Sequence, residues 1–346
     1  MRVNAVDVAV PDYLYHWDAA RYPNKFLLNF IWRDETVLKK WVFGWLFFAV
    51  AVTISNSGCA RELVIAFEHT LQPSTALDAM ARSQMLVRNL ATAGVPQAMF
   101  LIKTKGLDEK DEARLALYSD KGHLLVNAGH DHDLVTKSDL YVYEIGILKA
   151  NRLLENYNGY KHHVHFSYLH EPADINIQRG LADFLQERGY NPAFTGFNPM
   201  RGADQYLDRL YQKKISSNRS VDMAALERAY VDFLVQPLQQ QDALAFNLLG
   251  YSPRQVLVIQ ESDLAAYFIV AVVDKLIEQG WTIIAAERAM NDPIANPIAA
   301  NRWGANGYLN SITRLRDESV IYPRVLGERK PLIDNFLQTR VAGLLE

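Results

Sequence analysis

Histidines and carboxylates gather in the first half of this 346-residue chain. All but one of its nine histidines lie between His69 and His170, and most of them stand at the ends of short apolar runs. Imidazoles and carboxylates that converge on one point can bind a zinc ion, and the same groups can act as a general acid and base. A single histidine at the end of a strand is more often a hydrogen-bonded structural group, so the cluster needs support from the elements around it.

Two kinds of pattern alternate from residue 62 onward, and they predict the elements that position these groups. Apolar, β-branched runs predict strands at residues 62–69, 97–104, 123–127, 162–167, 192–196, 255–260 and 282–285. Helical spacing predicts helices at 79–93, 110–121, 138–156, 175–188, 223–249 and 265–279, of which the fifth continues through Pro237. This alternation predicts one parallel α/β architecture, either open or closed into a barrel.

The carboxyl ends of parallel strands meet at one edge of a sheet, and binding and catalytic groups collect at that edge. Polar side chains stand at or just after this end of several predicted strands. They are Glu68, His69, Asn127, His130, Asp131, His132, His165, His170, Glu171, Asn198 and Gln260. We therefore expect a single site in which groups far apart in the sequence lie together.

Several segments resemble the polysaccharide deacetylase family in their order and spacing. They are ELVIAFEHT, KGHLLVNAGHDH, FSYLHE, FLQERGYNPAF and VLVIQESDLAAYFIVAVVDKLIEQGWTIIAAERAMNDP. The resemblance covers residues 62–292. It implies a distorted (β/α) barrel of roughly seven parallel strands. It also implies an enzyme that removes acetyl groups from sugars with a divalent metal, for which zinc is the expected cofactor.

The positions that carry the chemistry depart from the family's pattern. Where the family has two aspartates after its first strand, this chain has Glu68 and His69. The resemblance makes Glu68 the candidate base and His69 a candidate metal ligand. The family's two histidine ligands, four residues apart, align with Ala128 and His132. Alanine cannot bind a metal, and His130 lies between the two as a candidate substitute.

Three further family motifs are also altered. The motif that orients the base aligns with residues 165–167, and the next aligns with residues 196–200, where its aspartate is absent. The family's proton-donating histidine is replaced by Gln260, which has no proton to give near neutral pH. General acid catalysis and metal-activated water each contribute orders of magnitude, so we expect little of the ordinary deacetylase rate.

Two functions stay open. In the first, the barrel binds a glycan or a partner protein without catalysis. In the second, the chain is an active metal-dependent hydrolase that removes acetyl groups from a cell-envelope or plant-type polysaccharide. Its metal is then held by His69 and His132, together with His130 or Glu68. The candidate residues for binding substrate at the barrel mouth are Asn127, His165, Tyr168, His170, Glu171, Asn198 and Gln260, beside Phe166 and Phe197.

An apolar run precedes the only cysteine. Lys39 and Lys40, the apolar residues 41–53 and the small residues before Cys59 resemble a bacterial lipoprotein signal. The run is shorter than the roughly 20 apolar residues of a membrane span, and a buried strand or an interfacial helix is the alternative. The resemblance predicts a lipid anchor at Cys59, which would tether the protein to the membrane of a bacterial cell envelope.

Composition excludes other classes of function. A formal net charge of −3 and a pI near 6.3 give no basic field, and there is no glycine-rich phosphate loop, so we expect no nucleic-acid partner. One cysteine excludes an internal disulfide. The predicted organisation is a tail or mis-assigned start (1–36), a signal segment (37–59), a barrel (60–292) and an irregular C-terminal segment (293–346) with a short helix at 330–345.

Overall fold

The computed structural model describes residues 61–131, 140–165, 175–193 and 203–290. Every described residue belongs to one unit of the chain, Gly58–Glu346. The predictions for the signal segment, for Cys59 and for the C-terminal segment fall outside the described residues.

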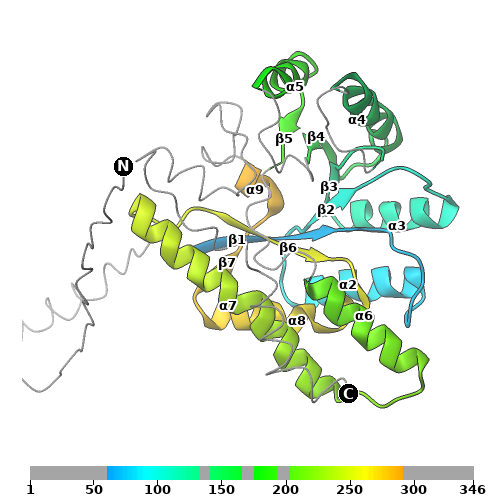
Figure 1. The fold of residues 1–346 in the computed structure, drawn as a ribbon, viewed down its shortest axis with the longest axis vertical. Helices are drawn as coiled ribbons and strands as arrows, with labels where there is room; N and C mark the ends of the chain where they lie inside the picture. Colours follow the sequence, from blue (N-terminus) through cyan, green and yellow to red (C-terminus); the bar gives the residue numbers. More distant parts are fainter. Residues whose placement is uncertain (1–60, 132–139, 166–174, 194–202, 291–346) are drawn as a thin grey trace, which may run out of the picture. The chain divides into compact units, whose positions relative to one another are not determined.

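Seven parallel strands form one sheet (Figure 1). They are β1 (Arg61–Glu68), β2 (Met99–Ile102), β3 (Leu124–Asn127), β4 (Tyr160–Val164), β5 (Asn191–Pro192), β6 (Gln255–Gln260) and β7 (Trp281–Ile283). The strand order is β5-β4-β3-β2-β1-β6, and β7 pairs with the start of β1. The pairings among these strands are parallel, as expected for strands joined by crossover helices. The predicted α/β fold with parallel strands is confirmed.

β1 lies inside the sheet and has neighbours along both of its edges. Leu63 pairs both with Gln255 of β6 and with Ile283 of β7, so these two strands lie on opposite edges of β1. β2 pairs with β1 further along, at Ala66 and Phe67. Consequently β7 and β2 follow one another along a single edge of β1.

Helices connect the strands. They are α2 (Ala79–Thr92), α3 (Glu109–Asp120), α4 (Leu140–Leu154), α5 (Ile175–Glu187), α6 (Ala203–Ser216), α7 (Met223–Leu249), α8 (Asp263–Glu278) and α9 (Ala286–Met290). The six predicted helices are confirmed to within a few residues at each end. α7 continues through Pro237, as predicted, and ends at Gly250, whose φ of 79° is the left-handed conformation that glycine adopts readily.

The sequence did not predict α6, and the reason lies on its buried face. Four residues at helical spacing are buried there: Asp204, Leu207, Asp208 and Tyr211. Two of these four positions carry aspartate, so the apolar periodicity that normally marks an amphipathic helix is interrupted. The same two aspartates reappear below at the candidate site.

The sheet is covered by apolar residues on both faces. Leu63, Ile65 and Phe67 of β1 belong to the larger cluster, which joins the sheet to α2, α7 and α8 on one face (Figure 1). Val64 and Ala66 belong to a second cluster on the other face, built mostly from the alternate residues of β1, β2, β3 and β6 and from α9. None of the helices in the described ranges is long and apolar enough to cross a membrane.

Candidate functional site at the carboxyl edge of the sheet

Strand register places several predicted site residues at one edge. Glu68 and Gln260 are direct partners at the carboxyl ends of β1 and β6. Asn127, at the end of β3, pairs with Val164 of β4, and His165 follows Val164 in the chain. The described part of the candidate site therefore has two sides, one built on β1 and β6 and the other on β3 and β4.

Part of the predicted site falls on residues that the structure does not describe. This part comprises His132, Phe166, Tyr168, His170, Glu171, Phe197 and Asn198, and their roles stay predictions. Of the three histidines expected to converge on a metal, His69 and His130 are described.

The turn that follows β1 has an unusual backbone. His69 has a φ of 48° and Leu71 a φ of 63°, the left-handed region that residues with a side chain adopt at a cost. The hydroxyl of Thr70, between them, donates a hydrogen bond of 2.8 Å to the carbonyl of Leu101. Such strained positions persist only where surrounding contacts hold them, and they concentrate at functional sites. Glu68, directly before this turn, is 8 % exposed.

Asn127 is a structural residue in the described geometry. It is fully buried, its amide nitrogen donates to the carbonyl of Ile147 at 3.0 Å, and its amide oxygen accepts from the backbone of Gly129 at 2.8 Å. The side chain thereby joins β3 to α4 and shapes the turn after β3. Because both ends of the amide are engaged in these bonds, Asn127 acts on the site mainly by holding the turn.

Ala128 lies in an apolar setting at the place where the resemblance expects a histidine ligand. It is 8 % exposed and belongs to the apolar cluster on the α9 face, together with Leu101, Val126 and Ala193. A ligand side chain here would have to enter a packed apolar cluster. This position therefore does not supply a metal donor.

His130 makes a contact of its own. Its Nδ1 lies 3.0 Å from the hydroxyl oxygen of Thr104, a residue of the β2–α3 loop. Next to it, Asp131 forms an ion pair with Lys105. Within the described ranges, no group of three or more histidine, cysteine, aspartate or glutamate side chains is arranged to hold a metal ion. The donors in this part of the chain do not form the family's ligand set.

Two other histidines are both buried but lie at opposite ends of the sheet. His123 precedes β3, at the opposite end of the sheet, and its Nδ1 accepts a hydrogen bond of 3.2 Å from the backbone of Ala98. Burial lowers the pKa of His123 to about 4, so this imidazole is neutral at physiological pH. His165 follows β4 at the carboxyl edge and is 8 % exposed. Part of the histidine cluster is therefore core structure.

Asp204 is a site residue that the sequence analysis missed. It lies in the first turn of α6, and its Oδ2 accepts a hydrogen bond of 2.7 Å from the backbone amide of Gln260. The pKa of Asp204 is raised to about 7. Burial is the largest cause; the hydrogen bond from the Gln260 amide acts in the opposite direction, and the neighbouring carboxylate of Glu68 raises the pKa further. A carboxyl group with this pKa can carry a proton near neutral pH, which Gln260 cannot do.

One turn further along α6, Asp208 repeats this arrangement. It accepts a hydrogen bond of 3.0 Å from the backbone amide of Leu264, in the first turn of α8. Burial raises the pKa of Asp208 to about 6. Two aspartates four residues apart thus attach one face of α6 to the end of β6 and the start of α8. That spacing was the only signal in the sequence that could have found them.

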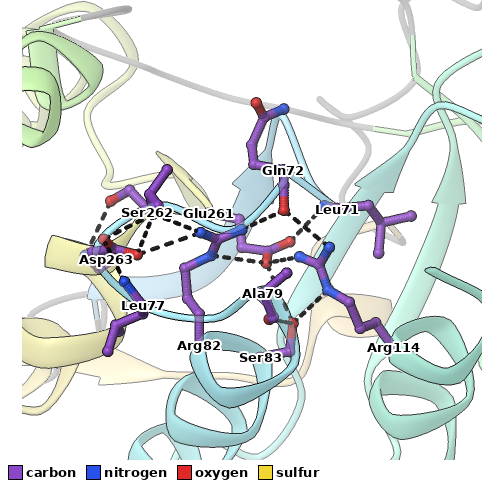
Figure 2. Close-up of polar contacts among 12 residues, drawn as sticks. Leu71, Gln72, Leu77, Ala79, Arg82, Ser83, Arg114, Glu261, Ser262 and Asp263 are labelled. Atoms are coloured by element: carbon purple, nitrogen blue, oxygen red, sulfur yellow. Dashed lines mark hydrogen bonds and ion pairs between the residues drawn. The ribbon is translucent and has the colours of Figure 1, made fainter. Parts of the chain in front are cut away.

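Behind the β1–α2 loop (residues 69–78) lies a buried group of charges, which we call the arginine–carboxylate cluster. It consists of Arg82, Arg114, Glu261 and Asp263 (Figure 2). The two arginines come from α2 and α3, and the two acids follow β6. Their side chains are at most 1 % exposed. None of the four residues was predicted from the sequence to have a role in the site.

Comparisons with known proteins give structural likenesses only. No protein-family model matches the chain, and no curated protein matches it. Among solved structures it is similar to the peptidoglycan deacetylase PdaC from Bacillus subtilis, with 13% identity over 75% of this chain and 94% of that one, at a TM-score of 0.42. It is also similar to a family 4 acetyl xylan esterase from Clostridium thermocellum in complex with a cobalt ion, with 10% identity over 71% and 98% of the chains and a TM-score of 0.43.

A third likeness is to a protein described as a pseudoenzyme. This is a CE4 family pseudoenzyme from Bacillus anthracis, with 11% identity over 68% of this chain and 67% of that one, at a TM-score of 0.44. The solved structures are of the kind that the sequence resemblance names, and they are described as a deacetylase, an esterase and a pseudoenzyme. The activity of this chain has to be argued from its own residues.

Proposed function

We propose that this chain is a polysaccharide deacetylase-like protein that binds a glycan at the carboxyl edge of its sheet and lacks ordinary metal-dependent deacetylase activity. We also propose that a lipid on Cys59 tethers it to a bacterial cell envelope. The observation that carries the first proposal is the setting of Ala128, because an apolar cluster fills the position from which the resemblance expects a metal ligand.

The polar groups at this edge support binding to a carbohydrate. Gln260 offers an amide, Glu68 a carboxylate and His165 an imidazole, and the register of β1, β6, β3 and β4 orders them along the edge. Such groups form hydrogen bonds with the hydroxyl and acetamido groups of sugars. The predicted mouth residues Tyr168, Glu171 and Asn198 would extend the same surface.

The alternative is an active hydrolase with a rearranged site, and one observation favours it. Asp204 and Glu68 are neighbouring carboxyl groups beside Gln260, and the pKa of Asp204 is raised to about 7. A carboxyl group that holds a proton near neutral pH can act as a general acid. In this case Asp204 would supply the proton that the family takes from a histidine.

A combined measurement on the purified full chain separates the two functions. Metal content is measured by mass spectrometry, acetate release is assayed with acetylated chitooligosaccharides, acetylated xylan and peptidoglycan fragments, and binding to the same glycans is measured by calorimetry. The proposal expects binding without acetate release. Acetate release that is lost on Asp204→Asn or Glu68→Gln would establish the alternative. If no glycan in this panel binds, glycan binding at the edge is rejected.

Variants then locate the binding surface. Glu68→Gln and Gln260→Ala change groups at the carboxyl edge and should weaken glycan binding about tenfold each, the usual effect of removing a well-placed hydrogen bond. The matched controls are Glu187→Gln and Gln186→Ala, which change the same residue types at exposed positions near the end of α5. Equal losses in all four variants would place binding somewhere else on the chain.

A further inference from the structure

The arginine–carboxylate cluster is bonded internally through both of its acids. Oε1 of Glu261 forms ion pairs with Arg114 and, at 3.6 Å, with Nε of Arg82. Oδ1 of Asp263 lies 3.3 Å from Nη1 of Arg82. Glu261 is thus shared between the two arginines, and two positive charges face two negative charges in a buried site (Figure 2).

Each of these side chains also binds the backbone of the β1–α2 loop. Glu261 accepts from the amide of Leu71 at 2.8 Å, and both arginines donate to the carbonyl of Gln72. Arg82 also donates to the carbonyl of Pro73 at 3.2 Å. Near the other end of the loop, Asp263 accepts from the side-chain hydroxyl of Thr75 and from the backbone amides of Ala76 and Leu77. Backbone amides of the loop thus donate to carboxylates and a backbone carbonyl accepts from guanidinium groups, as Figure 2 shows at Leu71, Leu77 and Gln72.

Stability alone is a poor explanation for so many buried charges. Taking four charges out of water is costly, and buried ion pairs can often be replaced by apolar residues without loss of stability. Apolar residues cannot bond the amides and carbonyls of a turn, however. These bonds begin at Leu71, one of the two residues of this loop with left-handed backbone, and the other, His69, lies two residues before it.

We propose that Arg82, Arg114, Glu261 and Asp263 are positioning residues, which fix the strained β1–α2 loop and so hold Glu68 and His69 in place at the ligand-binding edge. The part of this inference that concerns a ligand rests on the proposed glycan binding. The part that concerns the loop stands independently of it. The cluster acts through the backbone and does not touch the ligand.

The test replaces one buried pair by apolar residues of similar size. In Arg114→Met/Glu261→Met, the loop loses the hydrogen bond from the Leu71 amide to Glu261 and the one from Arg114 to the Gln72 carbonyl. Arg82 and Asp263 remain paired. The matched control is Arg254→Met/Glu62→Met, an ion pair of 2.7 Å at the opposite end of β1. Arg114→Lys serves as a conservative variant, because lysine keeps the charge and can still donate to Glu261.

Amide hydrogen exchange of the full-length protein provides the readout for the loop. In the first double variant, exchange in residues 69–77 should accelerate about tenfold or more, while exchange in β6 and α8 stays within about twofold of the parent. The Arg114→Lys variant should keep most of the parent's protection against exchange in this loop, and the control pair should exchange there at the parent's rate. A uniform acceleration across the barrel would mean a merely structural role and would overturn the proposal, as would an unchanged loop.

Glycan binding provides the second readout. The proposal expects the first double variant to bind the glycan about tenfold more weakly, as for residues that orient a ligand-contacting group, and the control pair to bind like the parent. Unchanged affinity in spite of a loosened loop would overturn the positioning role. If the parent protein binds no glycan, the proposed function fails, and the exchange experiment still decides whether the cluster fixes the loop.

Discussion

The two sides of the carboxyl edge hold their site residues by different means. On the β1–β6 side, ionisable carboxyl groups bind the backbone: Asp204 binds the Gln260 amide and Glu261 binds the Leu71 amide. On the β3–β4 side, neutral groups do this, since Asn127 shapes the turn after β3, and Ala128 packs in an apolar cluster. The side built with charges holds the strained loop, whereas the neutral side has an alanine where the resemblance expects a ligand.

This difference has an energetic meaning. A buried charge whose partner is removed costs far more than a neutral group that loses a hydrogen bond. We therefore expect the β1–β6 side to respond strongly to single substitutions and to pH. The β3–β4 side should respond to side-chain volume.

The largest effect is expected when one acid is removed from the arginine–carboxylate cluster. Asp263→Ala takes a carboxylate from Arg82 and an acceptor from Thr75, Ala76 and Leu77. Breaking a buried ion pair on one side should lower the free energy of unfolding by about 3–5 kcal/mol, measured by urea denaturation.

The control for that variant lies on the same helix. Asp274→Ala changes an exposed aspartate of α8 and should shift the free energy of unfolding by no more than about 0.5 kcal/mol. A loss below about 1 kcal/mol in Asp263→Ala would show that the buried charges are not tightly coupled, and the contrast between the two sides would disappear.

The next effect is a dependence of stability on pH. Burial raises the pKa of Asp204 to about 7 and that of Asp208 to about 6, above the values near 4 expected in the unfolded chain. The folded state therefore binds these protons more tightly than the unfolded state does. Their contribution to stability is complete below about pH 4 and is lost as the pH rises through about 6 and 7.

Each group should change the free energy of unfolding by about 1 kcal/mol per pH unit within its window. Urea titrations at several pH values measure the slope, and Asp204→Asn and Asp208→Asn should each flatten it. Neighbouring charges that act on the two groups are Glu68, Asp263 and Arg82. A slope that the two variants leave unchanged would assign the pH dependence to other groups.

A volume change tests the β3–β4 side. Ala128→His puts a larger, polar side chain into the apolar cluster and should lower the free energy of unfolding by about 1–3 kcal/mol without creating a zinc site. Ala113→His, on an exposed face of α3, is the control and should cost less than about 1 kcal/mol. A stable Ala128→His protein that binds one equivalent of zinc would mean that the edge still contains a metal site lacking a single ligand.

Much of the fold could be predicted from the sequence, and the reason is periodicity. The uninterrupted apolar runs of β1 and β6 are direct consequences of burial on both faces of a parallel sheet. Helix α6 was not predicted, because Asp204 and Asp208 occupy buried positions where an amphipathic helix normally has apolar residues. The same two aspartates therefore bond α6 to the end of β6 and the start of α8, and prevent its prediction from the apolar pattern.

The candidate site was less predictable. Glu68 and Gln260 could be placed at one edge because strand ends in a parallel sheet coincide. The arginine–carboxylate cluster could not be found in this way, since Arg82 and Arg114 lie on helices, where charged residues are usually solvated. The left-handed backbone at His69 left no trace either, because glycine, its usual signal, is absent.

That backbone provides the smallest of the expected effects. At a φ of 48°, glycine is favoured over alanine, so His69→Gly should be more stable than His69→Ala by about 1 kcal/mol in urea denaturation. Gln72, three residues later, is exposed and does not have a positive φ, so the order should reverse there, with Gln72→Ala the more stable variant. If His69→Ala were more stable than His69→Gly, the backbone at His69 would not be strained, and the arginine–carboxylate cluster would not be needed to keep the loop in a strained conformation.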